Sequence, residues 1–235
     1  MTRMLASVSN CFEVDKLLTA QVDIIDLKDP SMGALGAVSC EVACEVVKRV
    51  NHRKPVSATI GDLQSPAAID SAIRQMSATG VDIIKVGIFT ETMGDTLFSV
   101  LQGNADAGVN LVLVFFADIG FSTMHFHQLS VIGIRGVMLD TANKHSGSLT
   151  TILDSRKIEN FVSQAHQHGL WAGLAGSLQA GDIEELLACT PDYLGFRGAI
   201  CCERNRNGSI DIHAVNHIRQ LIPVLAGDPA SRSAS

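Results

Sequence analysis

Short runs of apolar and β-branched residues alternate along this chain with longer stretches in which apolar positions recur every three or four residues. The short runs are typical of buried strands, and the longer period is typical of helices that cover them. The short runs predict eight strands, at residues 4–9, 22–28, 55–60, 81–88, 110–118, 136–141, 170–176 and 193–200. The longer stretches predict helices near residues 11–20, 39–50, 65–79, 93–106, 124–132, 154–168, 179–188 and 211–221.

Local signals mark where several helices begin and end. Asn10 followed by Glu13 fits a capping box, and Ser65 before Pro66 offers a capping hydroxyl with proline at the first helical position. A glycine, which tolerates the left-handed backbone of a helix end, stands just ahead of four of the predicted strands: Gly80, Gly108, Gly133 and Gly169.

Eight strand-plus-helix units predict an α/β protein with a (β/α)8 TIM barrel in one domain. The strands are apolar throughout, as expected of parallel strands that are buried on both faces. A doubly wound open sheet is the alternative, but no strand is followed by the GxGxxG turn of its dinucleotide-binding form. We expect the barrel to span residues 1–226 and the small, polar tail 227–235 to be disordered.

Composition narrows the possible partners. The 235 residues are 46% hydrophobic and carry a formal charge of −6, with 18 Lys and Arg against 24 Asp and Glu. An acidic chain lacks the basic surface that duplex nucleic acid or an anionic membrane requires, and no apolar run approaches the roughly 18 residues of a membrane span. Because the N-terminus also shows no signal-peptide pattern, we expect a cytoplasmic protein. The six cysteines show no paired CxxC spacing, so we expect reduced thiols and no metal site.

Charged residues interrupt the predicted strands near their C-terminal ends, where barrels carry their active sites. Asp26 and Lys28 share one face of the second strand, Lys85 interrupts the fourth, and Asp140 ends the sixth. Lys144 follows four residues after Asp140. A structural ion-pair network is one explanation, but several lysines at one end of a barrel fit it poorly, because lysine is seldom buried without a function or a partner.

Lysines in a dry pocket predict amine catalysis. Burial beside another cation lowers the pKa of a lysine, and the neutral amine can then attack a carbonyl to form a Schiff base. Carbon–carbon bond formation or cleavage follows if an acid or base is in reach, and Asp26, Asp140 and Lys144 are candidates. Spacing alone leaves open which lysine forms the imine.

Two glycine-punctuated loops point to a phosphorylated substrate. Gly173–Ser177 follows the seventh strand and Gly195–Ala199 ends the eighth, which is where barrels commonly bind phosphate through backbone N–H groups. Turns that merely need glycine are the alternative. Arg197 and Arg204 could add charge-assisted contacts. The predicted phosphate-binding residues are Gly176, Ser177, Arg197, Gly198 and Arg204.

The sequence also resembles a known family over nearly its whole length. The resemblance is to the (5-formylfuran-3-yl)methyl phosphate synthases of methanofuran biosynthesis. It is carried, in order, by residues 26–30, 33–37, 57–62, 84–87, 117–118, 138–142 with Lys144, 174–177 and 197–199. It implies a cofactor-free, metal-free lyase that condenses two molecules of glyceraldehyde 3-phosphate into 4-(hydroxymethyl)-2-furancarboxaldehyde phosphate, with loss of phosphate and water.

The resemblance also implies roles for individual residues. It makes Lys28 the Schiff-base lysine and places Lys85, Asp26, Asp140 and Lys144 in the catalytic group. The chain departs from the family pattern at His145, where an acidic residue is usual, and in the loop 200–206, which lacks the family's lysine- and glycine-rich segment. Arg204 or Arg206 is then the candidate for the second phosphate contact.

Three functions are therefore open at the sequence level: the furan-forming synthase, another Schiff-base aldolase or lyase acting on a small sugar phosphate, and a non-catalytic barrel that binds phosphorylated metabolites. We further expect a homo-oligomer, because barrels of this size often associate.

Overall fold

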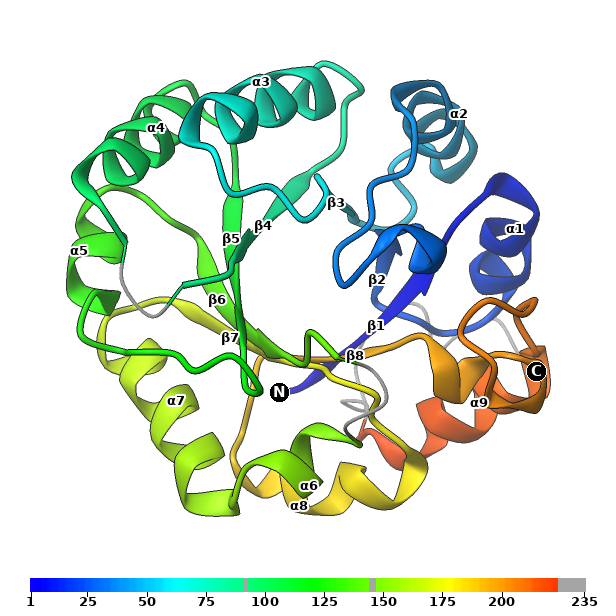
Figure 1. Ribbon diagram of the computed structural model, residues 1–235. Helices are drawn as coiled ribbons and strands as arrows, with labels where there is room; N and C mark the ends of the chain where they lie inside the picture. The colour runs from blue at the N-terminus through cyan, green and yellow to red at the C-terminus, as the bar shows by residue number, and fades with distance from the viewer. Residues whose placement is uncertain (91–92, 144–146, 224–235) are drawn as a thin grey trace.

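Eight parallel strands close into a barrel at the centre of the molecule (Figure 1). The computed structural model describes residues 1–90, 93–143 and 147–223, so the predicted tail, the domain boundary at 226, Lys144 and His145 lie outside the described residues. Each strand pairs with its neighbours in chain order, and β1 closes the barrel against β8. The strands are β1 (Arg3–Val8), β2 (Ile24–Leu27), β3 (Val56–Thr59), β4 (Ile83–Ile88), β5 (Leu111–Phe116), β6 (Gly136–Asp140), β7 (Trp171–Leu174) and β8 (Tyr193–Phe196).

Helices form an outer ring around the strands, as the alternating pattern predicts (Figure 1). They are α1 (Cys11–Thr19), α2 (Cys40–Val50), α3 (Pro66–Ser77), α4 (Asp95–Asp106), α5 (Phe126–Val131), α6 (Leu149–Ile152), α7 (Ser155–Gln167), α8 (Ile183–Ala188) and α9 (Ile212–Leu221). Short 3₁₀ turns add η1 (Pro30–Met32), η2 (Ala180–Asp182), η3 (Gly198–Ile200) and η4 (Cys202–Arg204). The sequence pattern did not predict α6 or the four 3₁₀ turns, because pieces this short show no period.

Helix ends largely follow the local signals. Asn10 caps α1 by accepting the Glu13 N–H, and all four predicted helix-ending glycines have positive φ angles between 71° and 87°. Ser65, however, makes no side-chain capping bond, so α3 begins on the proline signal alone. The prediction of an eighth strand to residue 200 is also wrong: the backbone leaves the extended region at Arg197 (φ −132°, ψ −68°) and turns into η3.

Strand side chains alternate between two cores. Outward-facing residues pack against the helices in a large apolar core that runs around the barrel. Inward-facing residues fill the barrel itself with a second, smaller core, which includes Leu5, Ile24, Val112, Val114, Phe116, Met138 and Tyr193. Buried polar residues take other inward-facing positions of the strands, among them Ser7, Asp26, Ser57, Lys85 and Asp140.

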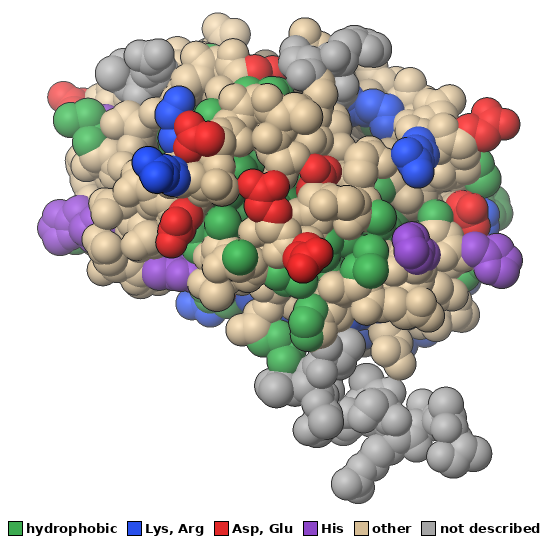
Figure 2. Space-filling model, turned by 90° about the horizontal axis from the view of Figure 1, so that it is seen from below, with side chains coloured by type: hydrophobic (Ala, Val, Ile, Leu, Met, Phe, Trp, Pro, Cys, Tyr) green, Lys and Arg blue, Asp and Glu red, His purple; other side chains and the backbone are tan. Residues whose placement is uncertain are grey.

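The surface agrees with the acidic composition. Figure 2 shows one side of the barrel, where acidic side chains lie across the middle and basic ones are scattered rather than joined into a stripe. Within the described ranges, no helix is both long and apolar enough to cross a membrane. All six cysteines are unpaired.

Candidate active site

The charged residues predicted from the strands meet at the C-terminal mouth of the barrel. Alternation turns Asp26 on β2, Lys85 on β4 and Asp140 on β6 inward, and Lys28 follows directly after β2. We call these four residues the polar cluster. All four line one pocket of about 520 Å³, a size typical of small-molecule sites.

Asp26 is the fixed centre of the polar cluster. Its carboxylate is fully buried and accepts hydrogen bonds from the hydroxyls of Ser7 at 2.8 Å and Ser57 at 2.6 Å. The Nζ of Lys85 lies 2.6 Å from its Oδ1. Strand register explains the match, since Ser7, Asp26 and Ser57 are aligned across β1, β2 and β3. These contacts hold Asp26 and Lys85 as an ordered pair.

Lys85 is buried near two carboxylates, Asp26 and Asp140, and near the positive charge of Lys28. Burial lowers the pKa of its ammonium, the Asp26 carboxylate works against this, and the positive charge of Lys28 adds to the lowering. An amine whose protonation is disfavoured in this way is suited to exchanging protons with a bound molecule.

Lys28 occupies a more open position than Lys85. Its side chain is 9% exposed against 4% for Lys85, and its Nζ lies 3.5 Å from Oδ2 of Asp140. Asp140 also accepts the backbone N–H of Thr141 at 2.7 Å. The two lysines therefore differ in their contact with a carboxylate. Lys85 lies close to Asp26, whereas Lys28 lies in the pocket at a longer distance from Asp140.

The predicted phosphate-binding residues line the same pocket as the polar cluster. Gly176 has a φ of 106°, and a side chain there would collide with Thr141, so the position favours glycine. Ser177 follows with a φ of 51°. The structure thus brings the glycine turns after β7 and β8, together with Arg204, into the lining of one pocket.

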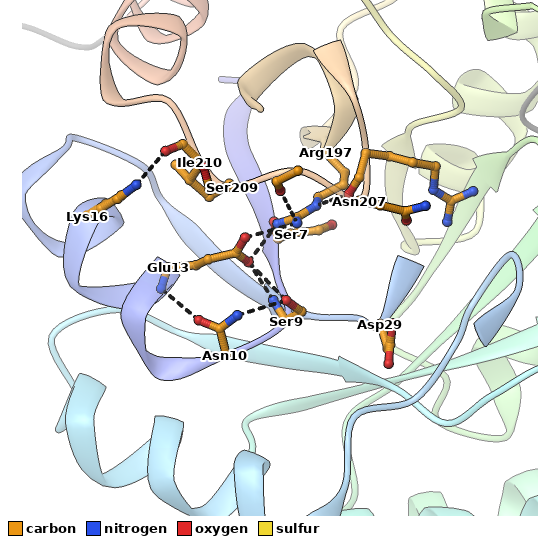
Figure 3. A network of polar contacts seen from close by, with 12 residues as sticks. Ser7, Ser9, Asn10, Glu13, Lys16, Asp29, Arg197, Asn207, Ser209 and Ile210 are labelled. Atoms are coloured by element: carbon orange, nitrogen blue, oxygen red, sulfur yellow. Dashed lines mark hydrogen bonds and ion pairs between the residues drawn. The ribbon is translucent and has the colours of Figure 1, made fainter. Parts of the chain in front are cut away.

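Arg197 lies at this pocket but is fully engaged with the protein (Figure 3). Its Nη1 and Nη2 donate to Glu13 at 2.7 and 3.0 Å. The other three bonds go to carbonyl oxygens of Ser7, Arg206 and Gly208. A guanidinium has five N–H donors, and here each has a protein acceptor. The geometry therefore does not support a direct phosphate contact by Arg197. Arg197 nevertheless remains one of the residues that line the pocket.

The sequence does not predict several residues that hold the charged side chains of the site. Ser7 and Ser57 give no such signal, because an inward-facing serine carries no sign of the carboxylate that it meets on the next strand. The sequence predicts Glu13 only as part of a helix start. Arg206, the predicted alternative phosphate ligand, does line the pocket.

Among the described residues, no three His, Cys, Asp or Glu side chains lie in an arrangement that could hold a metal ion. The pocket itself is lined by two lysines, two carboxylates and the glycine turns after β7 and β8.

Comparison with known proteins decides the family. The 4-HFC-P synthase family matches residues 4–219. The chain belongs to this family. It is 30% identical to the (5-formylfuran-3-yl)methyl phosphate synthase of Methanopyrus kandleri, over 94% of this chain and 98% of that protein. A protein of Methylorubrum extorquens to which the same activity is provisionally attributed is 37% identical, over 89% of this chain and 86% of its own length.

Solved structures agree on the barrel. The 3-hexulose-6-phosphate synthase of Salmonella typhimurium superimposes with a TM-score of 0.69 at 13% identity, covering 94% of this chain and 98% of that one. Identity this low shows the fold alone. The family match and the synthases among its relatives identify this 4-HFC-P synthase family member as an enzyme.

Proposed function

We propose that the protein condenses two molecules of glyceraldehyde 3-phosphate into 4-(hydroxymethyl)-2-furancarboxaldehyde phosphate, releasing phosphate and water. The observation that carries the proposal is the single pocket in which two buried lysines, two carboxylates and the glycine turns of β7 and β8 lie together. A pocket lined by amines, carboxylates and glycine turns suits a small phosphorylated aldehyde.

Lys28 is the proposed nucleophile. Its neutral amine attacks the aldehyde carbon, the carbonyl oxygen leaves as water, and the imine forms as a carbon–nitrogen double bond. The setting of Lys28, more open than that of Lys85 and beside Asp140, supports this choice. The imine makes the neighbouring carbon acidic, and Lys85, Asp140 and Lys144 are the proposed groups that move protons there. Asp26 holds Lys85 in place.

The phosphate group is proposed to bind at Gly176, Ser177 and Gly198, with charge supplied by the two arginines of the loop after η3. Arg204 is exposed at the pocket rim, and Arg206 is half-buried in its wall. A cytoplasmic location and a homo-oligomeric state stay predictions from the sequence.

The proposed reaction is tested by incubating the protein with glyceraldehyde 3-phosphate and analysing the product by absorbance and mass. A conjugated furan aldehyde absorbs well above the peptide band, whereas an ordinary aldol product does not. Borohydride reduction of the same mixture shows whether the substrate forms an imine with the protein. An imine without the furan product would instead establish another Schiff-base aldolase. If neither the imine nor the product forms, the protein is a binding protein.

The first prediction concerns Lys28. Borohydride reduces an imine to a stable adduct, so the wild-type protein should gain the mass of the reduced substrate and Lys28→Ala should not. Lys28→Arg should fail equally, because guanidinium stays protonated and cannot attack a carbonyl. Lys48→Ala, which removes an exposed lysine of α2, is the control and should trap substrate normally. A Lys28→Ala protein that still forms the adduct would move the nucleophile to Lys85.

A further inference from the structure

A buried ion pair links α1 to the loop after β8 (Figure 3). Glu13 and Arg197 meet in a bidentate contact, and their side chains are 8% and 10% exposed. Glu13 is also fixed from its own side, because its Oε2 accepts the backbone N–H of Ser9 at 2.8 Å. The carboxylate is therefore oriented by α1 before it meets the guanidinium.

Arg197 in turn binds the second half of the loop that follows it, at Arg206 and Gly208. We call residues 198–210 the β8 loop. The Nε of Arg197 donates to the carbonyl oxygen of Arg206 at 2.8 Å, and its Nη2 donates to that of Gly208 at 2.9 Å. These bonds fold the β8 loop back on its own start, and directed bonds of this kind set backbone orientation more closely than apolar packing does.

Arg206 is placed at the pocket by this arrangement. Its carbonyl oxygen is held by Arg197, while its side chain lines the pocket and its Nη2 donates to the Gly33 carbonyl oxygen at 3.1 Å. Burial lowers the pKa of Arg206 and the Asp140 carboxylate raises it, which places its guanidinium within electrostatic reach of the polar cluster. A half-buried cation facing a pocket of this kind is suited to an anionic group of the substrate.

We propose that Glu13 is a positioning residue: through Arg197 it fixes the β8 loop so that Arg206 meets the anionic group of the substrate. The inference rests on the proposed function for the identity of that substrate, and on the geometry alone for the action of Glu13 through Arg206. The chain offers a matched control on the same helix, because Asp15 of α1 makes a bidentate pair with Arg49 at 2.7 and 2.6 Å on the exposed surface.

The first measurement needs no activity. Cys201 of the β8 loop is buried, whereas its neighbour Cys202 is exposed, so alkylation by iodoacetamide, mapped by mass, reports opening of the loop. We expect Glu13→Gln to raise the rate at Cys201 by at least about tenfold. Asp15→Asn and Arg206→Gln should leave that rate unchanged. Arg197→Lys, which keeps a charge for Glu13 but loses the fork of donors, should behave as Glu13→Gln does.

The second measurement is a double-mutant cycle read by the affinity for inorganic phosphate, followed by ³¹P line broadening, and by KM for glyceraldehyde 3-phosphate. Glu13→Gln and Arg206→Gln should each weaken phosphate binding by about tenfold. The double variant should be no weaker than Arg206→Gln alone, because Glu13 acts through Arg206. KM should rise in parallel with the loss of phosphate affinity, while kcat should change by less than about twofold.

Two results would overturn the proposal: losses that multiply in the double variant, or a Glu13→Gln protein with an accessible Cys201 and wild-type phosphate affinity. Failure of the proposed function has a different signature. A wild-type protein that binds phosphate but forms no product from glyceraldehyde 3-phosphate removes the reaction and leaves the cycle on phosphate affinity intact.

Discussion

At the scale of single residues, side chains of the same type have different roles here because their hydrogen-bond acceptors differ. Arg197 and Arg206 both line the pocket. Arg197 donates all five of its hydrogen bonds to protein acceptors, so its role is structural. Arg206 instead lies in the pocket wall, where its side chain donates to the Gly33 carbonyl oxygen. The two lysines divide in the same way, since Lys85 is clamped by Asp26 and Lys28 is held more loosely.

A residue-scale prediction concerns the Cys201 thiol. Burial raises its pKa from 9.0 to about 11, with Arg197 opposing and Glu13 adding to the effect. Between these two values the unfolded thiol ionises while the folded one does not, so the folded state holds more protons and the free energy of unfolding falls as pH rises.

The expected size of this loss is roughly 2–3 kcal/mol, since one pKa unit corresponds to about 1.4 kcal/mol. Urea denaturation from pH 8 to pH 11 should therefore show the wild type losing stability relative to Cys201→Ala above pH 9. Cys202→Ala, at the exposed neighbouring position, should keep the wild-type profile. A constant difference between wild type and Cys201→Ala across this range would show that the thiol is not desolvated.

At the scale of elements, aspartates tie neighbouring units together at both ends of the barrel. At the N-terminal end, an aspartate just before a strand accepts a backbone N–H at 2.7 Å from the preceding strand of the barrel: Asp23 from Met4, Asp82 from Val56 and Asp192 from Ala172. At the site end, Asp62 accepts from Ala34 and Leu35, and Asp118 accepts from Ala142 and Asn143. The first group fixes strands, and the second fixes the loops after β2 and β6.

The loop after β6 provides the element-scale prediction. Asp118→Ala removes two charge-assisted bonds of 2.7 Å to the backbone N–H groups of Ala142 and Asn143. Because that loop leads to Lys144, we expect kcat to fall by about tenfold, while the free energy of unfolding drops by about 1–3 kcal/mol. Asp82→Ala removes a comparable bond at the opposite end of the barrel, so it should cost stability and leave kcat unchanged. Equal kcat in the two variants would remove the loop from catalysis.

At the scale of the whole molecule, the inside of the barrel holds an apolar core and the polar cluster in contact with one pocket. Tyr193 on β8 fills the space beside Gly173 on β7. Leu5, Met138 and Ala175 of the inner core line the same pocket as the polar cluster. A dry floor is what allows buried lysines and carboxylates to interact strongly with each other rather than with solvent.

Gly173 tests this packing. An added methyl group would overlap the ring of Tyr193, which is buried and cannot move aside without disturbing the inner core. Gly173→Ala should therefore lower the free energy of unfolding by about 1–3 kcal/mol, as overpacking does in other cores. Gly181→Ala, an exposed position with no neighbour within 4 Å, should change it by less than about 0.5 kcal/mol. A Gly173→Ala protein as stable as the wild type would mean that the inner core has room to spare.

Much of this protein was determined by its sequence alone. The periodicity fixes the order of eight strand-and-helix units, because burial on both faces demands apolar runs and a covering helix demands an apolar stripe. Alternation along each strand then places Asp26, Lys85 and Asp140 on the inner face at one end, so the sequence predicts most of the polar cluster.

Only the tertiary structure decided which side chains contact one another. Local periodicity says which face a side chain takes, but not which residue lies across the barrel from it. Lys85 meets Asp26 because closure of the barrel sets the strand register, and Arg197 meets Glu13 across a sequence separation of 184 residues. A charge near a glycine turn looks the same in sequence whether its donors face a ligand or a buried carboxylate, and only the positions of the acceptors separate the two.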